Sequence, residues 1–286
     1  MRLTAMAPAK INRELRVGRL RADGYHEIRS RIVAIDLADR ISAEPADRLA
    51  FSCDDPAVPS GAENLVVRAA ELLAREAGIP ARARLRLEKR VPMGGGLGGG
   101  SSDAAAALLL LDRFWGLAAG RDRLVDLAAR LGSDVPFFLT GGEAEVSGRG
   151  EIVTPVEDSP SADLVLLVPP FSVSTAAVYR EYAGRGTLPE RLEISSGTGL
   201  RFLGRNDLAP AVLRIEPRME PYLAAAGAIT GDWAISGSGA TIVLHGVRPG
   251  DTERLSARVP DARLIACRTL SRPEYRARVG SAGGLS

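Results

Sequence analysis

The feature that most constrains this chain is a run of six glycines within the seven residues Gly94–Gly100. Apolar and charged residues alternate through residues 84–91, just before the run, which is typical of a strand. Residues 104–115, just after it, are rich in alanine and leucine and predict a helix. Glycine tolerates positive φ, so successive N–H groups can point into one concavity. A strand, such a loop and a helix N-terminus together predict a cradle for phosphate.

Other interpretations fit the loop less well. A flexible linker does not run directly from an alternating strand into a long alanine–leucine helix. Residues Gly95–Gly100 can be aligned with the G-x-G-x-x-G pattern of a Rossmann dinucleotide site, but the loop does not follow a first strand. The Ser-Ser-Asp sequence after it also suits contacts with phosphates or magnesium better than helix packing. The loop also lacks the Gly-Lys-Ser/Thr ending of a Walker A loop. We expect Ser101 and Ser102 at the helix N-cap, where capping competes with a phosphate or Mg²⁺ for their hydroxyls.

Composition narrows the class of protein. The 286 residues suffice for two modest domains or one large one, and a net charge of +2 is too small to predict a nucleic-acid or membrane partner. Cys53 and Cys267 lack metal-type spacing and are expected to be reduced. The N-terminus lacks the apolar stretch of a signal peptide, so we expect a cytoplasmic protein. Of the 37 basic residues, only Lys10 and Lys89 are lysines. A guanidinium cannot replace a compact ammonium where the group must fit among phosphates, so these two lysines are candidate site residues.

The polar, proline-bearing segment 157–162 predicts a boundary between two domains, residues 1–156 and residues 163–279. In the first domain, the apolar spacing of residues 63–77 predicts a helix, and residues 121–131 predict another. The second domain is expected to run strand, helices, two strands, helix and strand. With its central helices merged, this β-α-β-β-α-β order predicts a ferredoxin-like split βαβ sandwich.

The glycine-rich loop and several other segments resemble a known family. Residues Pro92–Ala105 look like the phosphate-binding motif of the GHMP kinases, which include galactokinase, homoserine kinase and mevalonate kinase. The Gly-Leu-Gly-Gly-Gly-Ser-Ser-Asp-Ala-Ala form is similar to the branch that acts on a cytidine-diphosphate-linked methylerythritol, whereas other branches usually have Gly-Leu-Gly-Ser-Ser-Ala. The segments that also agree with this branch span both halves of the chain. They are Ala7–Asn12, Asp23–Glu27, Leu131–Phe138, Asn206–Leu208 and Ile235–Thr241.

The resemblance implies an α+β, two-domain GHMP kinase fold. Its N-terminal domain would be a ribosomal-protein-S5-like α/β domain that binds ATP, and its C-terminal domain the ferredoxin-like one. It implies an ATP-dependent kinase that phosphorylates the 2-hydroxyl of its substrate, with Mg²⁺ neutralising the phosphates, in isoprenoid precursor synthesis. The expected partners are ATP and the small cytidylyl substrate, without nucleic acid or membrane. We expect a monomer or weak homodimer, and we predict no protein residue as a metal ligand.

Two residues match the catalytic positions of the family. Asp134 matches the aspartate that takes the hydroxyl proton as general base. On pattern alone it would instead be a carboxylate at a helix N-terminus, after Ser133 and before Pro136. Lys10 matches the active-site lysine, which lowers the pKa of the hydroxyl or holds Asp134 ionised. The alternative for Lys10 is a solvated surface lysine.

The resemblance also assigns residues to ATP. Lys89 is expected near the nucleotide, although a lysine on the apolar side of a strand is more often a snorkelling edge residue. Asn64 is expected beside the adenine. The complete set is Pro92, Met93, Gly94, Gly95, Gly96, Leu97, Gly98, Gly99, Gly100, Ser101, Ser102, Asn64 and Lys89.

A third set is assigned to the cytidylyl substrate. Aromatic residues are expected to bind the cytosine through its faces and its edge. Without the resemblance, His26 would be a turn residue and Tyr179 a helix core residue. Asn12 and Thr175 are expected to touch the erythritol or phosphate groups. Two glycines are expected to let the backbone approach the site, although a tight hairpin explains them as well. The set is Asn12, Tyr25, His26, Thr175, Tyr179, Gly237 and Gly239.

One departure from the family leaves a question open. Arg13 and Glu14 follow Asn12 where the family has an apolar strand, so the packing of that strand is not predicted. Another GHMP kinase, of the homoserine or mevalonate type, remains an alternative, as does a nucleotide-binding protein without catalysis. The Gly-Tyr-His segment that ends at His26 argues against the first, because those substrates carry no nucleobase. Retention of Lys10 together with the candidate base argues against the second.

Overall fold

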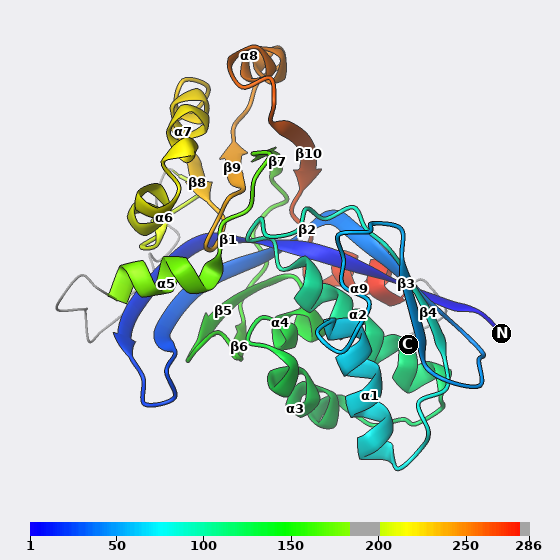
Figure 1. The fold of residues 1–286 in the computed structure, drawn as a ribbon. Helices are drawn as coiled ribbons and strands as arrows, with labels where there is room; N and C mark the ends of the chain where they lie inside the picture. The colour runs from blue at the N-terminus through cyan, green and yellow to red at the C-terminus, as the bar shows by residue number, and fades with distance from the viewer. Residues whose placement is uncertain (184–200, 281–286) are drawn as a thin grey trace.

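A long hairpin formed by β1 (Leu3–Leu20) and β2 (His26–Glu44) runs through the whole molecule (Figure 1). The structure is a computed structural model that describes residues 1–183 and 201–280. The two strands pair antiparallel, from Leu3 opposite Ala43 to Leu20 opposite His26. Both faces of the hairpin carry buried aliphatic side chains, so it contributes to two separate cores.

The first sheet contains six strands, and its apolar face packs against helices (Figure 1). Its order is β3-β4-β2-β5-β6, with β1 paired to β2. Leucines such as Leu73, Leu87 and Leu108 fill the space between strands and helices. The further elements of this half are β3 (Ala50–Cys53), α1 (Leu65–Ala77), β4 (Arg84–Glu88), α2 (Gly99–Phe114), α3 (Arg121–Leu131), α4 (Val135–Thr140), β5 (Glu143–Ser147) and β6 (Ile152–Pro155).

The second sheet has four antiparallel strands in the order β10-β7-β9-β8. Its first and third strands lie in the middle, as in the predicted split βαβ sandwich. A smaller core that includes Ile11, Val33 and Leu166 joins this sheet to the hairpin. The elements are β7 (Asp163–Val168), α5 (Thr175–Ala183), α6 (Ala209–Ile215), η1 (Pro217–Met219), α7 (Glu220–Gly227), β8 (Trp233–Ile235), β9 (Ile242–His245), α8 (Asp251–Arg258) and β10 (Arg263–Arg268).

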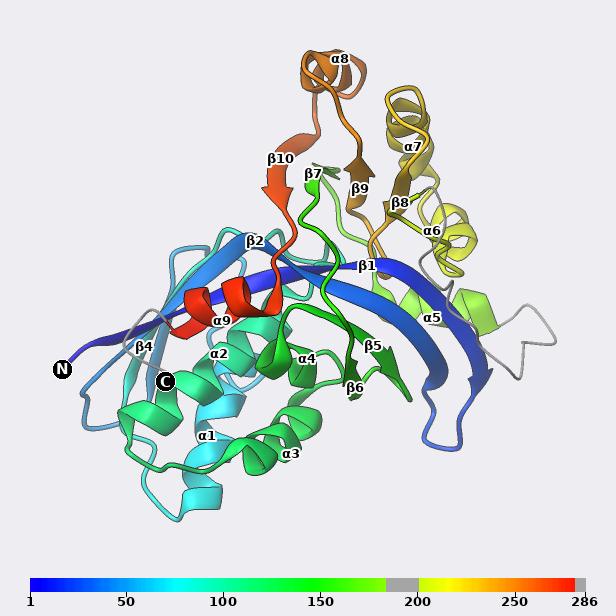
Figure 2. The ribbon, with the colours of Figure 1, turned by 180° about the vertical axis from the view of Figure 1, so that it is seen from behind.

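The last helix, α9 (Arg272–Gly280), was not predicted from the sequence. It returns to the first half of the chain and packs against β1 (Figure 2). The hydroxyl of Tyr275 donates to the Phe138 carbonyl at 2.6 Å. The predicted division into residues 1–156 and 163–279 stays a prediction. Within residues 1–183 and 201–280, no helix is long and apolar enough to cross a membrane.

The helices predicted from apolar spacing are present, but the helix after the glycine-rich loop begins earlier than expected. Residues 121–131 form α3 as predicted. Helix α2 begins at Gly99, and its N-cap is Gly98, with a φ of 69°. The prediction that Ser101 and Ser102 form the N-cap is therefore wrong. The turn into the helix needs the left-handed backbone conformation, which glycine adopts without strain, so it forms at Gly98.

Arg13 is accommodated by a polar network between β1 and β5. Its Nη1 lies 2.5 Å from Glu143 Oε1 and 2.8 Å from Ser159 Oγ, and its guanidinium lies 4.1 Å over the Phe202 ring. Arg31 shares Glu143 Oε1 at 2.6 Å. Burial by itself would raise the pKa of Glu143, but the hydrogen bonds from Ser159 and the two arginine charges outweigh it and lower the pKa. Arg13 therefore fixes β1 through charge where the family uses apolar packing.

Replacing Glu143 by glutamine should destabilise the fold by about 3–5 kcal/mol, because two largely buried guanidinium groups lose their shared anion. The matched change Glu145→Gln, on the same strand, removes a more exposed pair with Arg29 and should cost about 0–1 kcal/mol in chemical denaturation. A carboxylate whose pKa is lowered by folding stabilises the folded state at pH values above its pKa in the unfolded chain, which is about 4.3. This stabilisation is lost as the pH falls through the pKa of the folded state. The difference in the free energy of unfolding between wild type and Glu143→Gln should therefore become smaller below about pH 4. Equal destabilisation by both variants at neutral pH would contradict this account.

Candidate functional site

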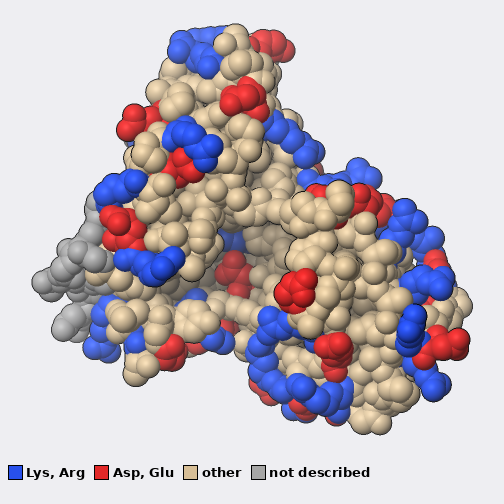
Figure 3. All heavy atoms as spheres, in the orientation of Figure 1, with Lys and Arg blue, Asp and Glu red and all other residues tan. Residues whose placement is uncertain are grey.

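A cleft of about 1080 Å³ lies where β1, the glycine-rich loop and α5 meet, and Figure 3 shows the hollow in the surface. Most of the predicted site residues line it. They are Lys10, Asn12, Tyr25, His26, Lys89, Pro92 to Ser101, Asp134, Thr175, Tyr179 and Gly237. Three others, Asn64, Ser102 and Gly239, are not among its lining residues. Polar lining residues that sequence reasoning missed are Ser133, Arg149, Arg180 and Ser238.

The glycine-rich loop is held against its neighbours on two sides. The backbone N–H of Lys10 donates to the Leu97 carbonyl at 3.0 Å. On the other side, Ser236 Oγ donates to the Gly96 carbonyl at 3.0 Å. A Cβ at Gly96 would lie 2.0 Å from the Ser236 carbonyl oxygen, so only glycine fits there. The loop is therefore held between β1 and the turn at residues 236–241.

Lys10, Asn12 and Asp134 meet in the cleft. Lys10 Nζ donates to Asn12 Oδ1 at 2.6 Å and lies 3.6 Å from Asp134 Oδ2. Lys10 is 4% exposed, whereas the Asp134 side chain is 40% exposed, so a buried ammonium adjoins a carboxylate that is open to the cleft. Asp134 directly precedes α4, but its side chain makes no capping hydrogen bond. The capping alternative is therefore not used, and the carboxylate remains available to an incoming hydroxyl.

An irregularity in β1 accompanies this arrangement. The pairing of β1 with β2 shifts register between Pro8 and Lys10, and such bulges re-aim side chains near sites. Ala9 and Ile11 pack in the smaller core against the second sheet. Because successive side chains of a strand point to opposite faces, Lys10 and Asn12 reach the cleft instead. The strand thus places two polar side chains in the cleft while its apolar neighbours anchor it.

Aromatic side chains form a second group in the cleft. The rings of His26 and Tyr179 are stacked, with centroids 5.7 Å apart and planes at 26°. His26 Nδ1 lies 2.8 Å from the Gly18 carbonyl oxygen. A carbonyl only accepts, so Nδ1 carries the proton and Nε2 of the neutral ring is an acceptor. Tyr25 is 50% exposed, and the Arg149 guanidinium lies 5.0 Å from its ring centroid.

Some residues of the predicted ATP set have their polar groups engaged by the protein. Asn64 caps α1, because its Oδ1 accepts the Val66 N–H at 2.8 Å. Ser102 Oγ donates to the Pro8 carbonyl at 2.7 Å. Lys89 Nζ is bonded to two carboxylates behind the loop, although the residue lines the cleft. Their contacts with a nucleotide stay predictions.

Comparison with known proteins agrees with this geometry. Residues 64–142 match the family model described as the GHMP kinases N terminal domain. The 4-diphosphocytidyl-2-C-methyl-D-erythritol kinase of Salinispora arenicola is 41% identical over 96% of this chain and 93% of its own length. The enzyme of that name from Anaeromyxobacter dehalogenans is 43% identical over 87% of this chain and 82% of its own length. The chain belongs to the 4-diphosphocytidyl-2-C-methyl-D-erythritol kinase family.

Solved structures agree on the fold. A crystal structure of 4-(cytidine 5'-diphospho)-2C-methyl-D-erythritol kinase has a TM-score of 0.74 and 34% identity, and the match covers 93% of this chain and 99% of that one. Homoserine kinase from Cytophaga hutchinsonii has a TM-score of 0.68 over 96% of both chains but only 17% identity, so it shows the fold alone. The predicted α+β GHMP kinase fold is confirmed, and the chain is a small-molecule kinase that uses ATP.

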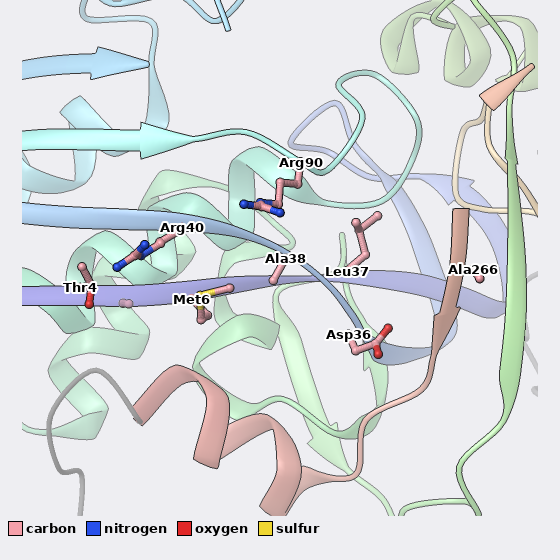
Figure 4. Close-up of a pocket in the computed structure, with 9 residues that line it drawn as sticks. Thr4, Met6, Asp36, Leu37, Ala38, Arg40, Arg90 and Ala266 are labelled. Atoms are coloured by element: carbon pink, nitrogen blue, oxygen red, sulfur yellow. The ribbon is translucent and has the colours of Figure 1, made fainter. Parts of the chain in front are cut away.

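A second cavity of the kinase, of about 690 Å³, lies on the other side of the hairpin (Figure 4). Thr4 and Met6 of β1 line it, with Arg40 of β2, Arg90 after β4 and Ala266 of β10. Thr4 and Met6 alternate with residues of β1 that pack in the helix-side core, so the cavity faces away from the helices. None of the predicted site residues lines it.

Replacing Gly98 by alanine should impair the kinase, because the added Cβ would lie 2.9 Å from Phe138 Cζ and 3.1 Å from Lys10 Cγ, at a φ of 69°. A strain of about 1–2 kcal/mol corresponds to roughly a tenfold loss of kcat/KM in a coupled ATPase assay. Gly100→Ala is the matched control, since its Cβ would meet only Leu65 Cδ1, at 3.9 Å. Similar losses of kcat/KM in both variants would show that the tight packing of Phe138 and Lys10 around Gly98 is not the cause.

Proposed function

We propose that this kinase transfers the γ-phosphoryl group of ATP to the 2-hydroxyl of 4-diphosphocytidyl-2-C-methyl-D-erythritol. The products are the 2-phosphate and ADP, in the methylerythritol phosphate route to isoprenoid precursors. The observation that carries the proposal is the pairing of Lys10 with Asp134 in the cleft that the glycine-rich loop borders. Identity with relatives of that name over nearly the whole chain supports the choice of substrate.

Asp134 acts as the general base. Its carboxylate is open to the cleft and takes the proton of the attacking hydroxyl, a contribution of about 10²–10⁴-fold. Lys10, 3.6 Å away, places a positive charge beside this carboxylate and stabilises negative charge on the reacting oxygen. Asn12 holds the ammonium of Lys10, and its own Nδ2 donates to Ser30 Oγ at 2.8 Å. The first bond lies within β1 and the second joins β1 to β2, and together they keep the ammonium in place during the reaction.

The glycine-rich loop, residues 92–102, binds the phosphates of ATP. Because α2 begins at Gly99, the N–H groups of its first turn have no partners within the helix, and its dipole favours an anion. Mg²⁺ neutralises the phosphate charge when it is bound. Within residues 1–183 and 201–280 there is no group of three or more His, Cys, Asp or Glu that suits a metal ion. Mg²⁺ usually keeps several waters and phosphate oxygens as ligands, so the site fits a cation that arrives with the nucleotide.

His26, Tyr179 and Tyr25 bind the cytosine. With Nδ1 directed to the Gly18 carbonyl, Nε2 of the imidazole is the ring nitrogen that can accept from the exocyclic amino group of the base. Burial raises the pKa of Tyr179, and the charge of Asp134 adds to the shift, so the phenol stays protonated. The face of the half-exposed Tyr25 ring offers a stacking surface. A substrate without a nucleobase would leave these groups unused.

The hydroxyls of Thr175 and Ser238 lie 2.7 Å apart at the cleft, and we assign them to the diphosphate or the erythritol. In this scheme residues 1–156 form the ATP-binding domain. Residues 163–279 form a second domain that adds Thr175, Tyr179 and the backbone at Gly237 to the substrate side. We propose that the enzyme works in the cytoplasm as a monomer or weak homodimer.

Asp134→Asn should lower kcat by about 10²-fold or more, because the amide cannot accept the hydroxyl proton. Affinity for ATP, measured calorimetrically, should remain close to that of wild type. The control is Asp122→Asn, in the first turn of α3. This change removes an exposed carboxylate and should leave kcat unchanged. A near wild-type kcat in Asp134→Asn would remove the residue from this role.

Tyr179→Ala should raise the KM for the cytidylyl substrate roughly 5–150-fold, since stacking on an aromatic ring contributes about 1–3 kcal/mol per base. Its KM for ATP should hardly change, and Tyr179→Phe, which keeps the ring, is the matched control. His26→Ala should act in the same direction. If both alanine variants leave the cytidylyl KM unchanged, or raise only that for ATP, a GHMP kinase of the homoserine or mevalonate type becomes the better assignment.

A further inference from the structure

Lys89 lies in a buried group of three charged side chains behind the glycine-rich loop. Its Nζ lies 2.5 Å from Asp39 Oδ2 and 3.1 Å from Asp103 Oδ2. The side chains of Lys89, Asp39 and Asp103 are 6%, 0% and 4% exposed. Charges this deeply buried are screened little by water or salt, so removing one partner has a large effect. None of the three takes part in the Lys10–Asp134 pair.

The group reaches both ends of the loop. Asp39 Oδ1 accepts the backbone N–H groups of Arg90 at 2.5 Å and Val91 at 2.9 Å, which are the last two residues before the loop. Asp103 lies on α2, one residue beyond the end of the loop. The Lys89 ammonium joins these two carboxylates. It thus connects β2 and the entry of the loop with the helix at its exit.

We propose that Asp39, Lys89 and Asp103 are positioning residues for ATP, which hold the entry and the exit of the glycine-rich loop at a fixed separation. The assignment rests on the proposed function, because it concerns the same phosphate site. A Cβ at Gly99 would lie 3.1 Å from Lys89 Nζ, so the loop exit is packed directly against the ammonium. Two of the three N–H groups of Lys89 are bonded to carboxylates, and the residue lines the cleft, which leaves one N–H for the nucleotide.

The two carboxyl groups have different roles. Asp39 accepts bonds from Lys89, Arg90 and Val91, as an ionised carboxylate does. Burial raises the pKa of Asp103 well above its usual range; Lys89 opposes this shift, and the nearby Asp39 adds to it. Asp103 Oδ1 is buried without a hydrogen-bond partner among the described residues. Asp39 therefore holds both Lys89 and the loop entry through three bonds, whereas Asp103 contributes one bond, from the helix at the loop exit.

This difference gives the test a clear signature. The full-length enzyme is titrated calorimetrically with a non-hydrolysable ATP analogue, and KM for both substrates and kcat are measured. Asp103→Asn keeps an oxygen that can accept the single bond from Lys89, so it should raise the Kd of the analogue by no more than about threefold. Asp39→Asn removes the anion that holds the ammonium and two N–H groups, and should raise that Kd at least about tenfold. The KM for the cytidylyl substrate should stay near wild type in both variants.

A second variant separates positioning from folding. Asp39→Asn combined with Lys89→Met removes the ammonium together with the carboxylate that accepts its shorter bond, so neither of these two charges is left buried without the other. It should unfold at a Tm close to that of wild type and still bind the analogue at least about tenfold more weakly. A lower Tm with an unchanged Kd in the Asp39 variants would overturn the proposal. Wild-type enzyme that binds the analogue normally but phosphorylates a different alcohol would overturn the proposed function while leaving the positioning role intact.

Discussion

The backbone of the glycine-rich loop is hydrogen-bonded on one side to β1 and on the other to the turn between β8 and β9. The N–H of Lys10 donates to the Leu97 carbonyl, and the N–H of Thr241 donates to the Gly95 carbonyl. Asn206 Nδ2 in turn donates to two carbonyls of that turn, at residues 235 and 237. Lys10, whose ammonium lies beside Asp134, is thus bonded to the glycine-rich loop through its own main chain. Any shift of the loop is transmitted to Lys10, and the turn limits that shift from the other side.

Both lysines of this arginine-rich chain are largely buried and lie among several polar partners. Lys10 is 4% exposed and lies between Asn12 and Asp134. Lys89 lies between two buried carboxyl groups. A compact ammonium can direct its three N–H groups to partners on different sides, whereas a planar guanidinium presents them in a fixed fork. Arg13, in contrast, uses its plane, since it spreads over the Phe202 ring while it reaches Glu143.

Sequence reasoning was least successful where the protein satisfies a polar side chain with its own backbone. Ser102 was expected at a helix cap and instead bonds to a carbonyl of β1, on a strand that lies far away in the sequence. Asn64 was assigned to the adenine, which stays a prediction, and its side chain was not expected to cap α1 as it does. The buried residue of helix α9 is Tyr275, whose hydroxyl is bonded to the carbonyl of Phe138 in α4. Because such bonds depend on which segments meet in space, neighbouring residues alone do not reveal them.

The sequence by itself determined the strand, the glycine-rich loop and the helix that follows, because glycine conformation and apolar periodicity act between neighbouring residues. Its ordered motifs also sufficed for the GHMP kinase fold, and they led to the prediction that Lys10 and Asp134 are the catalytic residues. Only the tertiary structure decided that these two side chains lie 3.6 Å apart, that His26 stacks on Tyr179, and that Lys89 is held by two buried carboxyl groups. Each of these contacts joins residues from different elements. Its geometry follows from the way both sheets pack on the β1–β2 hairpin, and that packing is a property of the whole chain.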